Sequence, residues 1–365
     1  MSIETNVVHT GDVRERLDDL PDDSVHMVMT SPPYWNLRDY DHADQLGLEP
    51  ESDQYVKNMA DVFDEVKRVL RPDGSLWLNL GDTYENKDLQ QIPARVALEL
   101  QQRGWILRNR VTWAKPNPMP QSVKDRLNDT TEAVFHFVKN KSYWYDLDAI
   151  REEHAESTME RGAGSDYSTK AYTAEHDDTV NHQKESTVHP AGKNPGDVFE
   201  VTTKPFPEAH FAVYPPELCE KPLKATCPPT VCAKCGSPYE REVDEHRQEQ
   251  TWEAGGQQED IESNNDGARR SAMSGKNYNY PHRVFKGWTP TCDCDTDATE
   301  VGIALDPFAG AGTTLLKAKE LGRQFVGIEL NAKYADMARA RVGIDVDDPS
   351  TVRDDADQSG LEAYD

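Results

Sequence analysis

Residues 301–342 alternate between strand-like and helix-like patterns, and this segment constrains the fold more than any other part of the chain. Short apolar runs at 301–305 and 324–330 are typical of buried strands, whereas 312–321 and 333–342 have apolar residues at helical spacing. Two strands joined by such a helix pair in parallel, because the chain crosses over the sheet between them. The segment therefore predicts a parallel sheet covered by helices.

The same alternation runs through residues 1–150. We expect strands at 25–30, 75–80, 105–113 and 132–139, and helices at 55–70 and 93–102. The chain is therefore predicted to be an α/β protein with a Rossmann-like, mostly parallel sheet and helices on both faces.

Two polar segments interrupt this pattern. Residues 152–195 have few aliphatic side chains, and residues 241–286 are rich in Gly, Asn and Gln. Regular patterns return at 196–202 and in a predicted helix at 215–225. We interpret the two polar segments as irregular insertions.

The composition excludes a fibrous or mostly disordered chain. Hydrophobic residues make up 36% of the 365 residues, which is enough for a packed core. No run approaches the roughly 18 apolar residues of a membrane span, and the first ten residues lack the basic and apolar regions of a secretion signal. We therefore expect a cytoplasmic protein.

A formal net charge of −26 would ordinarily argue against a nucleic-acid partner, because phosphate contacts need Lys and Arg, but the acidity has another explanation. An acidic, solvated surface is also typical of halophilic proteins, since at ~1 M salt the screening length is only about 3 Å. We interpret the charge as adaptation to salt. The alternative is a solvating acidic tail at 345–365 that says nothing about habitat.

A glycine-rich turn, DPFAGAGTT, follows the first strand of the C-terminal segment. Gly310 and Gly312 allow a tight turn and a close approach of a ligand to the free N–H groups of the next helix. Glu329 ends the next strand, at about the 20-residue spacing from Asp306 at which an acid reaches ribose hydroxyl groups. The pattern predicts a nucleoside site, although a plain tight turn would explain the glycines alone.

A second motif, TSPPYW, follows the predicted strand at 25–30. Pro32 and Pro33 fix the backbone and remove two donors, which leaves carbonyl groups and the Ser31 hydroxyl as acceptors. Such a loop can receive an amino group, and Tyr34 can stack on a flat ring. The motif gains weight from its place at the carboxyl end of a buried strand.

At these two motifs the sequence resembles the amino-group DNA methyltransferases that use S-adenosylmethionine. In that family an (S/N/D)PP(Y/W/F) loop holds the target amine, and a DPFAGSGTT-like segment binds the cofactor. Here the loop precedes the cofactor segment, which is the permuted order of the family's beta class. TSPPYW is most similar to the cytosine-N4 enzymes, whereas adenine-N6 enzymes more often carry DPPY. Adenine therefore stays as the alternative base.

The resemblance implies roles for individual residues. Those expected at the target amine are Ser31, Pro32, Pro33, Tyr34 and Asp82. Those expected at the cofactor are Asp12, His210, Phe211, Asp306, Pro307, Phe308, Gly310, Gly312, Thr313, Glu329 and Asn331.

The motifs, the cysteine pairs and the composition together predict a division of the chain. The expected parts are a catalytic part of the methyltransferase domain at 1–150, an irregular target-recognition insertion at 151–200, a return to that domain at 201–226, a zinc-ribbon-like insertion at 227–300, a cofactor-binding part at 301–344, and an acidic tail at 345–365.

The chemistry of methyl transfer to an exocyclic amine agrees with these residues. Such an amine is a poor nucleophile, and acceptors at the Ser31 hydroxyl and the Pro32 carbonyl can localise its lone pair for in-line attack. The base must first leave the duplex and stack, a role suited to Tyr34 and Trp35. Cytosine-C5 methylation instead needs a cysteine nucleophile, commonly after a proline, and no cysteine here follows a proline.

Residues 103–126 form a basic stretch in an acidic chain, so we expect double-stranded DNA to bind there. In the family a similar W-x-K-x-N segment lies beside the target base. The expected DNA-binding residues are Trp35, Arg108, Arg110, Lys115, Asn117, Lys124 and Arg126. The alternative is that these basic side chains pair with neighbouring acids.

Four of the six cysteines form two close pairs, Cys232 with Cys235 and Cys292 with Cys294. Cys-x-x-Cys-Gly is typical of a zinc knuckle, and two pairs supply the four ligands of a structural site. Free buried cysteines are the alternative, and Cys227 is an alternative ligand.

The sequence thus predicts methyl transfer from S-adenosylmethionine to cytosine N4, or secondarily adenine N6, in double-stranded DNA. A catalytically dead, zinc-containing nucleic-acid-binding protein is a different possibility, disfavoured by the intact motifs. Modification of a protein amide is disfavoured by the motif order. The sequence is compatible both with an enzyme that has a restriction endonuclease partner and with an orphan enzyme that has none.

Overall fold

The computed structural model describes residues 3–39, 45–156, 189, 191–204, 213–246 and 282–344. The chain divides into two compact units, of which the first comprises 1–150, 196–240 and 288–365 and the second comprises 151–195 and 241–287. The first unit contains the main sheet and the candidate site. The expected acidic tail lies outside the described residues.

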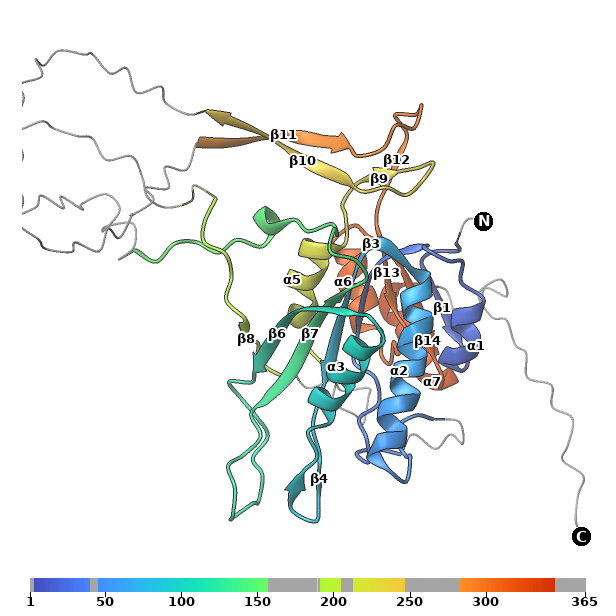
Figure 1. Ribbon diagram of the computed structural model, residues 1–365, viewed down its shortest axis with the longest axis vertical. Coiled ribbons are helices and arrows are strands. Elements are labelled where there is room, and N and C mark those ends of the chain that lie inside the picture. The colour runs from blue at the N-terminus through green and yellow to red at the C-terminus, as the bar shows by residue number, and fades with distance from the viewer. Residues whose placement is uncertain are drawn as a thin grey trace, which may run out of the picture. The chain divides into compact units, whose positions relative to one another are not determined.

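An eight-stranded sheet with the order β1-β14-β13-β2-β3-β7-β6-β8 forms the centre of the first unit (Figure 1). Its strands are β1 (Val7–Thr10), β2 (Val25–Thr30), β3 (Leu70–Leu80), β6 (Ile106–Ala114), β7 (Thr131–Val138), β8 (Val198–Glu200), β13 (Ile303–Asp306) and β14 (Gln324–Glu329). β7 is antiparallel to both of its neighbours, and every other neighbouring pair is parallel. The sheet is therefore mixed rather than wholly parallel.

Helices cover both faces of this sheet. One core contains side chains from α1 (Val13–Asp18), α2 (Ser52–Val69) and α3 (Ile92–Gln102), and the other contains side chains from α5 (Pro216–Thr226), α6 (Thr313–Glu320) and α7 (Ala332–Val342). Strand β2 joins the two cores, because Val28 lies in the first and Met27 and Met29 lie in the second. Alternate side chains of a strand point to opposite faces, so a strand buried on both faces is apolar throughout.

In α2, the apolar residues at helical spacing are the ones that pack in the core. The buried side chains of α2 include Tyr55, Met59, Phe63 and Val66, spaced three or four residues apart. Each large side chain that is fully buried contributes roughly 1.5–3 kcal/mol relative to exposure. None of the helices described in the structure is long and apolar enough to cross a membrane.

Most of the predicted strands and helices occur within a few residues of their expected bounds. Strand β1 and the six-residue helix α1 carry too few residues for a periodic pattern and were not expected. Residues 241–286 were expected to be irregular, but both ends of that segment are strands. β10 (Tyr239–His246) pairs with β11 (His282–Pro290) in a two-stranded ladder.

Two further ladders are short. β4 (Tyr84–Glu85) pairs with β5 (Asp88–Leu89), and β9 (Val231–Cys232) pairs with β12 (Thr299–Glu300). A single 3-10 turn, η1, spans Leu147–Ala149 in the part of the chain that the structure describes.

Candidate active site

A cavity of about 940 Å³ opens where several strands of the main sheet end. Ser31 follows β2, Asn79 lies near the end of β3, and Glu329 ends β14. Glu132 lies near the start of β7 and reaches the same edge because β7 runs the other way. Parallel sheets bind ligands at the carboxyl ends of their strands, and the volume is typical of a small-molecule site.

The glycine-rich turn between β13 and α6 forms one wall of this cavity. Gly310 and Gly312 have φ angles of 51° and 74°, in the left-handed region that favours glycine. A Cβ on Gly312 would lie 3.0 Å from the Cβ of Ala338, whereas a Cβ on Gly310 would meet nothing within 4 Å. Packing against α7 therefore limits Gly312, and Gly310 leaves its backbone open toward the cavity.

Glu329 joins the turn to the next strand. Its carboxylate accepts hydrogen bonds from the backbone N–H groups of Gly310, at 2.7 Å, and Asn331, at 2.9 Å. Burial raises the pKa of this carboxyl, and the two backbone donors oppose that rise. Each oxygen has a second lone pair, so the carboxylate can also accept from the hydroxyl groups of a ligand.

Asp306 is buried and supports the turn from behind. Its carboxylate accepts from the Thr30 hydroxyl at 2.6 Å, the Tyr214 hydroxyl at 3.0 Å and the Phe308 N–H at 3.1 Å. Burial raises its pKa against these donors. Asp306 is 0% exposed and is not among the described residues that line the cavity; its bond to the Phe308 N–H fixes the glycine-rich turn.

Other residues expected at the cofactor also lie around this wall. The described cavity lining includes Asp12, Pro307, Phe308, Thr313 and Asn331. Asp12 and Asn331 are the N-cap residues immediately before α1 and α7, and each side chain accepts from a backbone N–H of its helix. His210 and Phe211 lie outside the described residues.

A hydrogen-bond network forms another part of the cavity wall. Ser31 Oγ lies 3.0 Å from the Tyr34 hydroxyl, and that hydroxyl donates to Glu132 Oε2 at 2.7 Å. Asn79 Nδ2 donates to Ser31 Oγ at 3.2 Å and to the Tyr34 oxygen at 2.8 Å. Pro32 and Pro33 complete the loop and line the cavity.

The environment of Tyr34 keeps it protonated at neutral pH. Burial and the neighbouring Glu132 carboxylate raise the pKa of Tyr34 well above its usual value. A Cβ on Gly81 would come within 2.4 Å of the Tyr34 ring, so this ring packs directly against the backbone of Gly81. The one proton of the Tyr34 hydroxyl goes to Glu132, and Ser31 is therefore the donor in the Ser31–Tyr34 pair.

Lys115 and Asn117 follow β6 and line the same cavity. Lys115 forms an ion pair with Glu132, and its Nζ lies 4.6 Å from the centre of the Trp113 ring. Asn117 exchanges hydrogen bonds with the backbone of Thr203, at 3.0 Å as donor and 2.9 Å as acceptor. Lys115 therefore holds the carboxylate of the network, while Asn117 joins two loops at the rim.

Comparison with known proteins identifies the family. The model of the N6/N4 DNA methylases matches residues 25–232 and 296–340. The chain belongs to this DNA methylase family.

Relatives match this methylase over nearly its whole length. The type II methyltransferase M.SfiI of Streptomyces fimbriatus is 32% identical, with 90% of this chain and 88% of the relative covered. M.SmaI of Serratia marcescens is 28% identical, with 91% and 89% covered. The solved structure of the cytosine-N4-specific PvuII DNA methyltransferase has a TM-score of 0.56 at 16% identity and covers 95% of this chain and 89% of its own. That last likeness shows the fold.

Trp35 and Asp82 of the methylase lie elsewhere than expected. Trp35 is 3% exposed and packs in the core, where its indole N–H donates to the Glu49 carbonyl at 2.8 Å. Asp82 Oδ1 accepts from the N–H groups of Thr83, at 2.9 Å, and Ile92, at 3.0 Å. The Trp35 indole is thus buried in the core of this structure, and Asp82 fixes the loop before α3. The described cavity lining includes neither residue.

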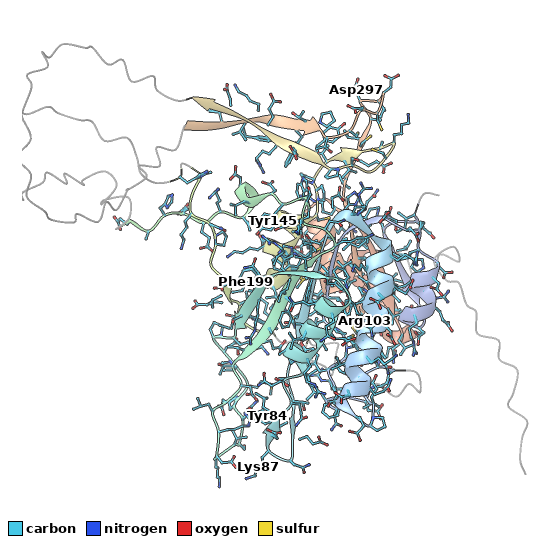
Figure 2. The ribbon with its side chains drawn as sticks, viewed as in Figure 1. Tyr84, Lys87, Arg103, Tyr145, Phe199 and Asp297 are labelled. Carbon is cyan, nitrogen blue, oxygen red and sulfur yellow. The ribbon has the colours of Figure 1, made fainter. Side chains whose placement is uncertain are left out.

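Four expected DNA-binding side chains are exposed or half-buried but lie outside the described cavity lining; they are Arg108, Arg110, Lys124 and Arg126. Arg108 donates to the Tyr143 hydroxyl at 2.9 Å. The guanidinium of Arg126 lies 4.0 Å from the centre of the Tyr84 ring. Tyr84 belongs to the short β4–β5 hairpin, where Figure 2 labels Tyr84 and Lys87.

The four paired cysteines come together in the structure. The ligand atoms of Cys232, Cys235, Cys292 and Cys294 all lie within 4.8 Å of one another. Cys227, the alternative ligand, is buried and is not in this group.

Sequence reasoning missed Asn79, Glu132 and Tyr214. Asn79 is the one polar residue of the apolar run LWLNL, and Glu132 is the second residue of a strand whose later residues are mostly apolar. A lone polar side chain near the end of a buried strand is a usable signal. For Glu132 that signal also requires knowing that β7 is antiparallel, because otherwise it would lie at the wrong edge.

Proposed function

We propose that the protein transfers a methyl group from S-adenosylmethionine to the exocyclic N4 amine of a cytosine flipped out of double-stranded DNA. The observation that carries the proposal is one cavity lined by both the Ser31 hydroxyl and the glycine-rich turn with Glu329. The motif TSPPYW favours cytosine N4 over adenine N6, and the PvuII methyltransferase, which has the same fold, is cytosine-N4-specific. Because the relatives are type II methyltransferases, a restriction endonuclease partner is one possible setting for this activity.

The cofactor side of the cavity suits an adenosine group. The Glu329 carboxylate is oriented by two backbone donors and can accept from ribose hydroxyls, while Gly310 leaves room beside its backbone. S-adenosylmethionine supplies a methyl group activated on a sulfonium. Asp306 contributes by holding the backbone of the turn through Phe308.

The catalytic side suits an amino group. Ser31 Oγ receives one hydrogen from Asn79 and gives its own to Tyr34, so one acceptor position is open to the target amine. Together with the Pro32 carbonyl, this acceptor draws the amine hydrogens toward the loop and localises the nitrogen lone pair for attack.

The same network provides a route for the proton that leaves after methylation. The methylated nitrogen releases one proton to Ser31 Oγ, the Ser31 proton passes to the Tyr34 oxygen, and the Tyr34 proton passes to the Glu132 carboxylate. The hydroxyl oxygens of Ser31 and Tyr34 each gain one proton and lose one, and the Glu132 carboxylate keeps the proton at the end of the route. Before the transfer, Lys115 stabilises the negative charge of Glu132. No covalent intermediate with the protein is required.

Nucleoside analysis tests the base assignment. Duplex DNA of varied sequence is incubated with the purified protein and S-adenosylmethionine, digested, and analysed by mass spectrometry. We expect N4-methylcytosine, much less of it with Ser31→Ala, and an unchanged amount with the control Ser142→Ala, whose side chain lies outside the described cavity lining. N6-methyladenine as the product would overturn the base assignment.

Calorimetry tests the cofactor assignment separately. Glu329→Ala should weaken S-adenosylmethionine binding by at least roughly tenfold, because charge-assisted hydrogen bonds are worth about 1.5–3 kcal/mol. Ser31→Ala should leave that affinity unchanged. Equal affinity in Glu329→Ala and the wild type would reject this side of the site.

A further inference from the structure

A group of four cysteines lies apart from the methylation site. Cys232 and Cys235 come from the end of β9 and the turn after it, and Cys292 and Cys294 come from the segment between β11 and β12. All four ligand atoms lie within 4.8 Å of one another. Two separate disulfides would need only two short pairs, whereas this geometry places every sulfur near every other one.

The backbone around the first pair is shaped as a tight knuckle. The N–H of Gly236 donates to the Cys232 carbonyl at 2.8 Å, and the N–H of Cys232 donates to the Ser237 carbonyl at 2.9 Å. Gly236 has a φ of 70°, which favours glycine at this position. The pairing of Cys232 with Thr299 brings the second cysteine segment alongside.

We propose that Cys232, Cys235, Cys292 and Cys294 bind one structural Zn²⁺ ion as a tetrahedral four-thiolate site. Four sulfur atoms that lie close enough to share one ion favour zinc over magnesium or calcium, because those two ions prefer oxygen ligands. Four protein ligands also leave no position for water or substrate, so the ion has a structural rather than a catalytic role.

The knuckle is attached to the main sheet by two of its carbonyl groups. Arg71 donates to the Cys235 carbonyl at 3.1 Å, and His26 Nε2 lies 2.9 Å from the Gly236 carbonyl. His26 Nδ1 accepts from the N–H of Ile303 at 3.1 Å, so the ring proton is on Nε2 and is donated to Gly236. A zinc ion that fixes the knuckle therefore also fixes the contacts between it, β2 and the start of β13.

These contacts lie at the opposite end of β2 from the catalytic loop. His26 is the second residue of β2 and Ser31 follows its last, so roughly 16 Å of strand separates them at about 3.3 Å per residue. Loss of the ion should consequently lower stability while leaving cofactor binding by the folded protein unchanged.

Metal analysis of the full-length protein, purified without added metal or chelator, tests the site. We expect one zinc per chain by mass spectrometry, and X-ray absorption should give a single shell of sulfur at about 2.3 Å. A zinc content far below one per chain, or a shell containing nitrogen or oxygen ligands, would overturn the proposal.

Variants separate this cluster from the other cysteines. Cys235→Ser and Cys292→Ser should each lose the zinc, whereas the control Cys227→Ala should keep it, because Cys227 lies outside the group. If the serine variants fail to fold, the wild-type protein can be titrated with a mercurial reagent that blocks thiols. One zinc ion should then be released for every four thiols blocked. Zinc retained in both serine variants, or release unrelated to thiol blocking, would contradict the assignment.

Removal of the zinc with a chelator tests its structural role. Removal of zinc should lower the melting temperature, while calorimetry below that temperature should give the same S-adenosylmethionine affinity as the untreated protein. An unchanged melting temperature after verified zinc removal would refute a structural role. Zinc content and melting temperature require neither cofactor binding nor methyl transfer, so they stand apart from the proposed function; only the affinity comparison rests on it.

Discussion

Four hydrogens connect the side chains around the loop that carries Ser31 and Tyr34. Tyr34 gives its proton to Glu132, Ser31 gives its own to Tyr34, and Asn79 shares its two amide hydrogens among the oxygens of the network. The sequence suggested a different role for Tyr34, stacking on the target base. The structure adds a polar role for its hydroxyl, and one substitution separates the two.

Tyr34→Phe removes the hydroxyl and keeps the ring against Gly81. If the hydroxyl carries the proton to Glu132, kcat should fall by roughly 10²-fold, a typical contribution of positioned acid–base groups. S-adenosylmethionine affinity should stay unchanged. Single-turnover kinetics on duplex DNA would measure the effect.

Tyr34→Ala provides the comparison for this prediction, because it removes the ring as well. Stacking of a base on an aromatic ring is worth about 1–3 kcal/mol. A fully active phenylalanine variant beside a weak alanine variant would leave stacking as the only role of Tyr34. A strong loss in both variants supports the proton route.

At the scale of elements, regular periodicity and local motifs were predictable from the sequence. Strand β2 spans the expected residues, and the glycine-rich turn lies between β13 and α6. Pairwise contacts between distant elements were not predictable. The burial of Trp35 depends on Glu49 and the core beneath it, and Glu132 enters the site only through the reversed direction of β7.

Asp82 shows how a residue near the site can serve an element instead. Its carboxylate accepts from the N–H of Ile92, the first residue of α3. Asp82→Ala should lower the free energy of unfolding by about 1 kcal/mol, the usual contribution of such a hydrogen bond, and leave kcat within a factor of a few. Denaturant unfolding and methyl-transfer rates would check both expectations.

Asp88→Ala is the matched control for Asp82→Ala, since Asp88 is an exposed acid in β5, within the same connection between β3 and α3. It should change neither stability nor rate. A loss of several hundredfold in kcat for Asp82→Ala, with stability intact, would return Asp82 to the catalytic residues.

At the scale of the whole molecule, acids outnumber bases by 66 to 40. Basic side chains in the described residues are often shared among acids, as when Arg103 pairs with Asp61, Asp64 and Glu99. Such exposed pairs each contribute little, and the surplus of acids repels itself when it is not screened. Salt should therefore stabilise the fold.

The expected dependence on salt is measurable. Between roughly 0.1 M and 1 M KCl the screening length falls from about 10 Å to about 3 Å, so the unfolding midpoint should rise over this range. DNA binding through phosphates weakens over the same range, and base contacts must then supply more of the affinity. A midpoint that is flat or falls with KCl would contradict adaptation to salt without affecting the methylase assignment.

A chain ending at residue 344 separates the two explanations of the charge. Residues 345–365 contain eight acids and one arginine, so their removal takes away a dense part of the negative charge. If the shortened chain keeps the rise in midpoint, the acids spread over the folded part produce the salt dependence. If the rise disappears with the tail, the charge is that of a solvating tail, and the halophilic interpretation loses its basis.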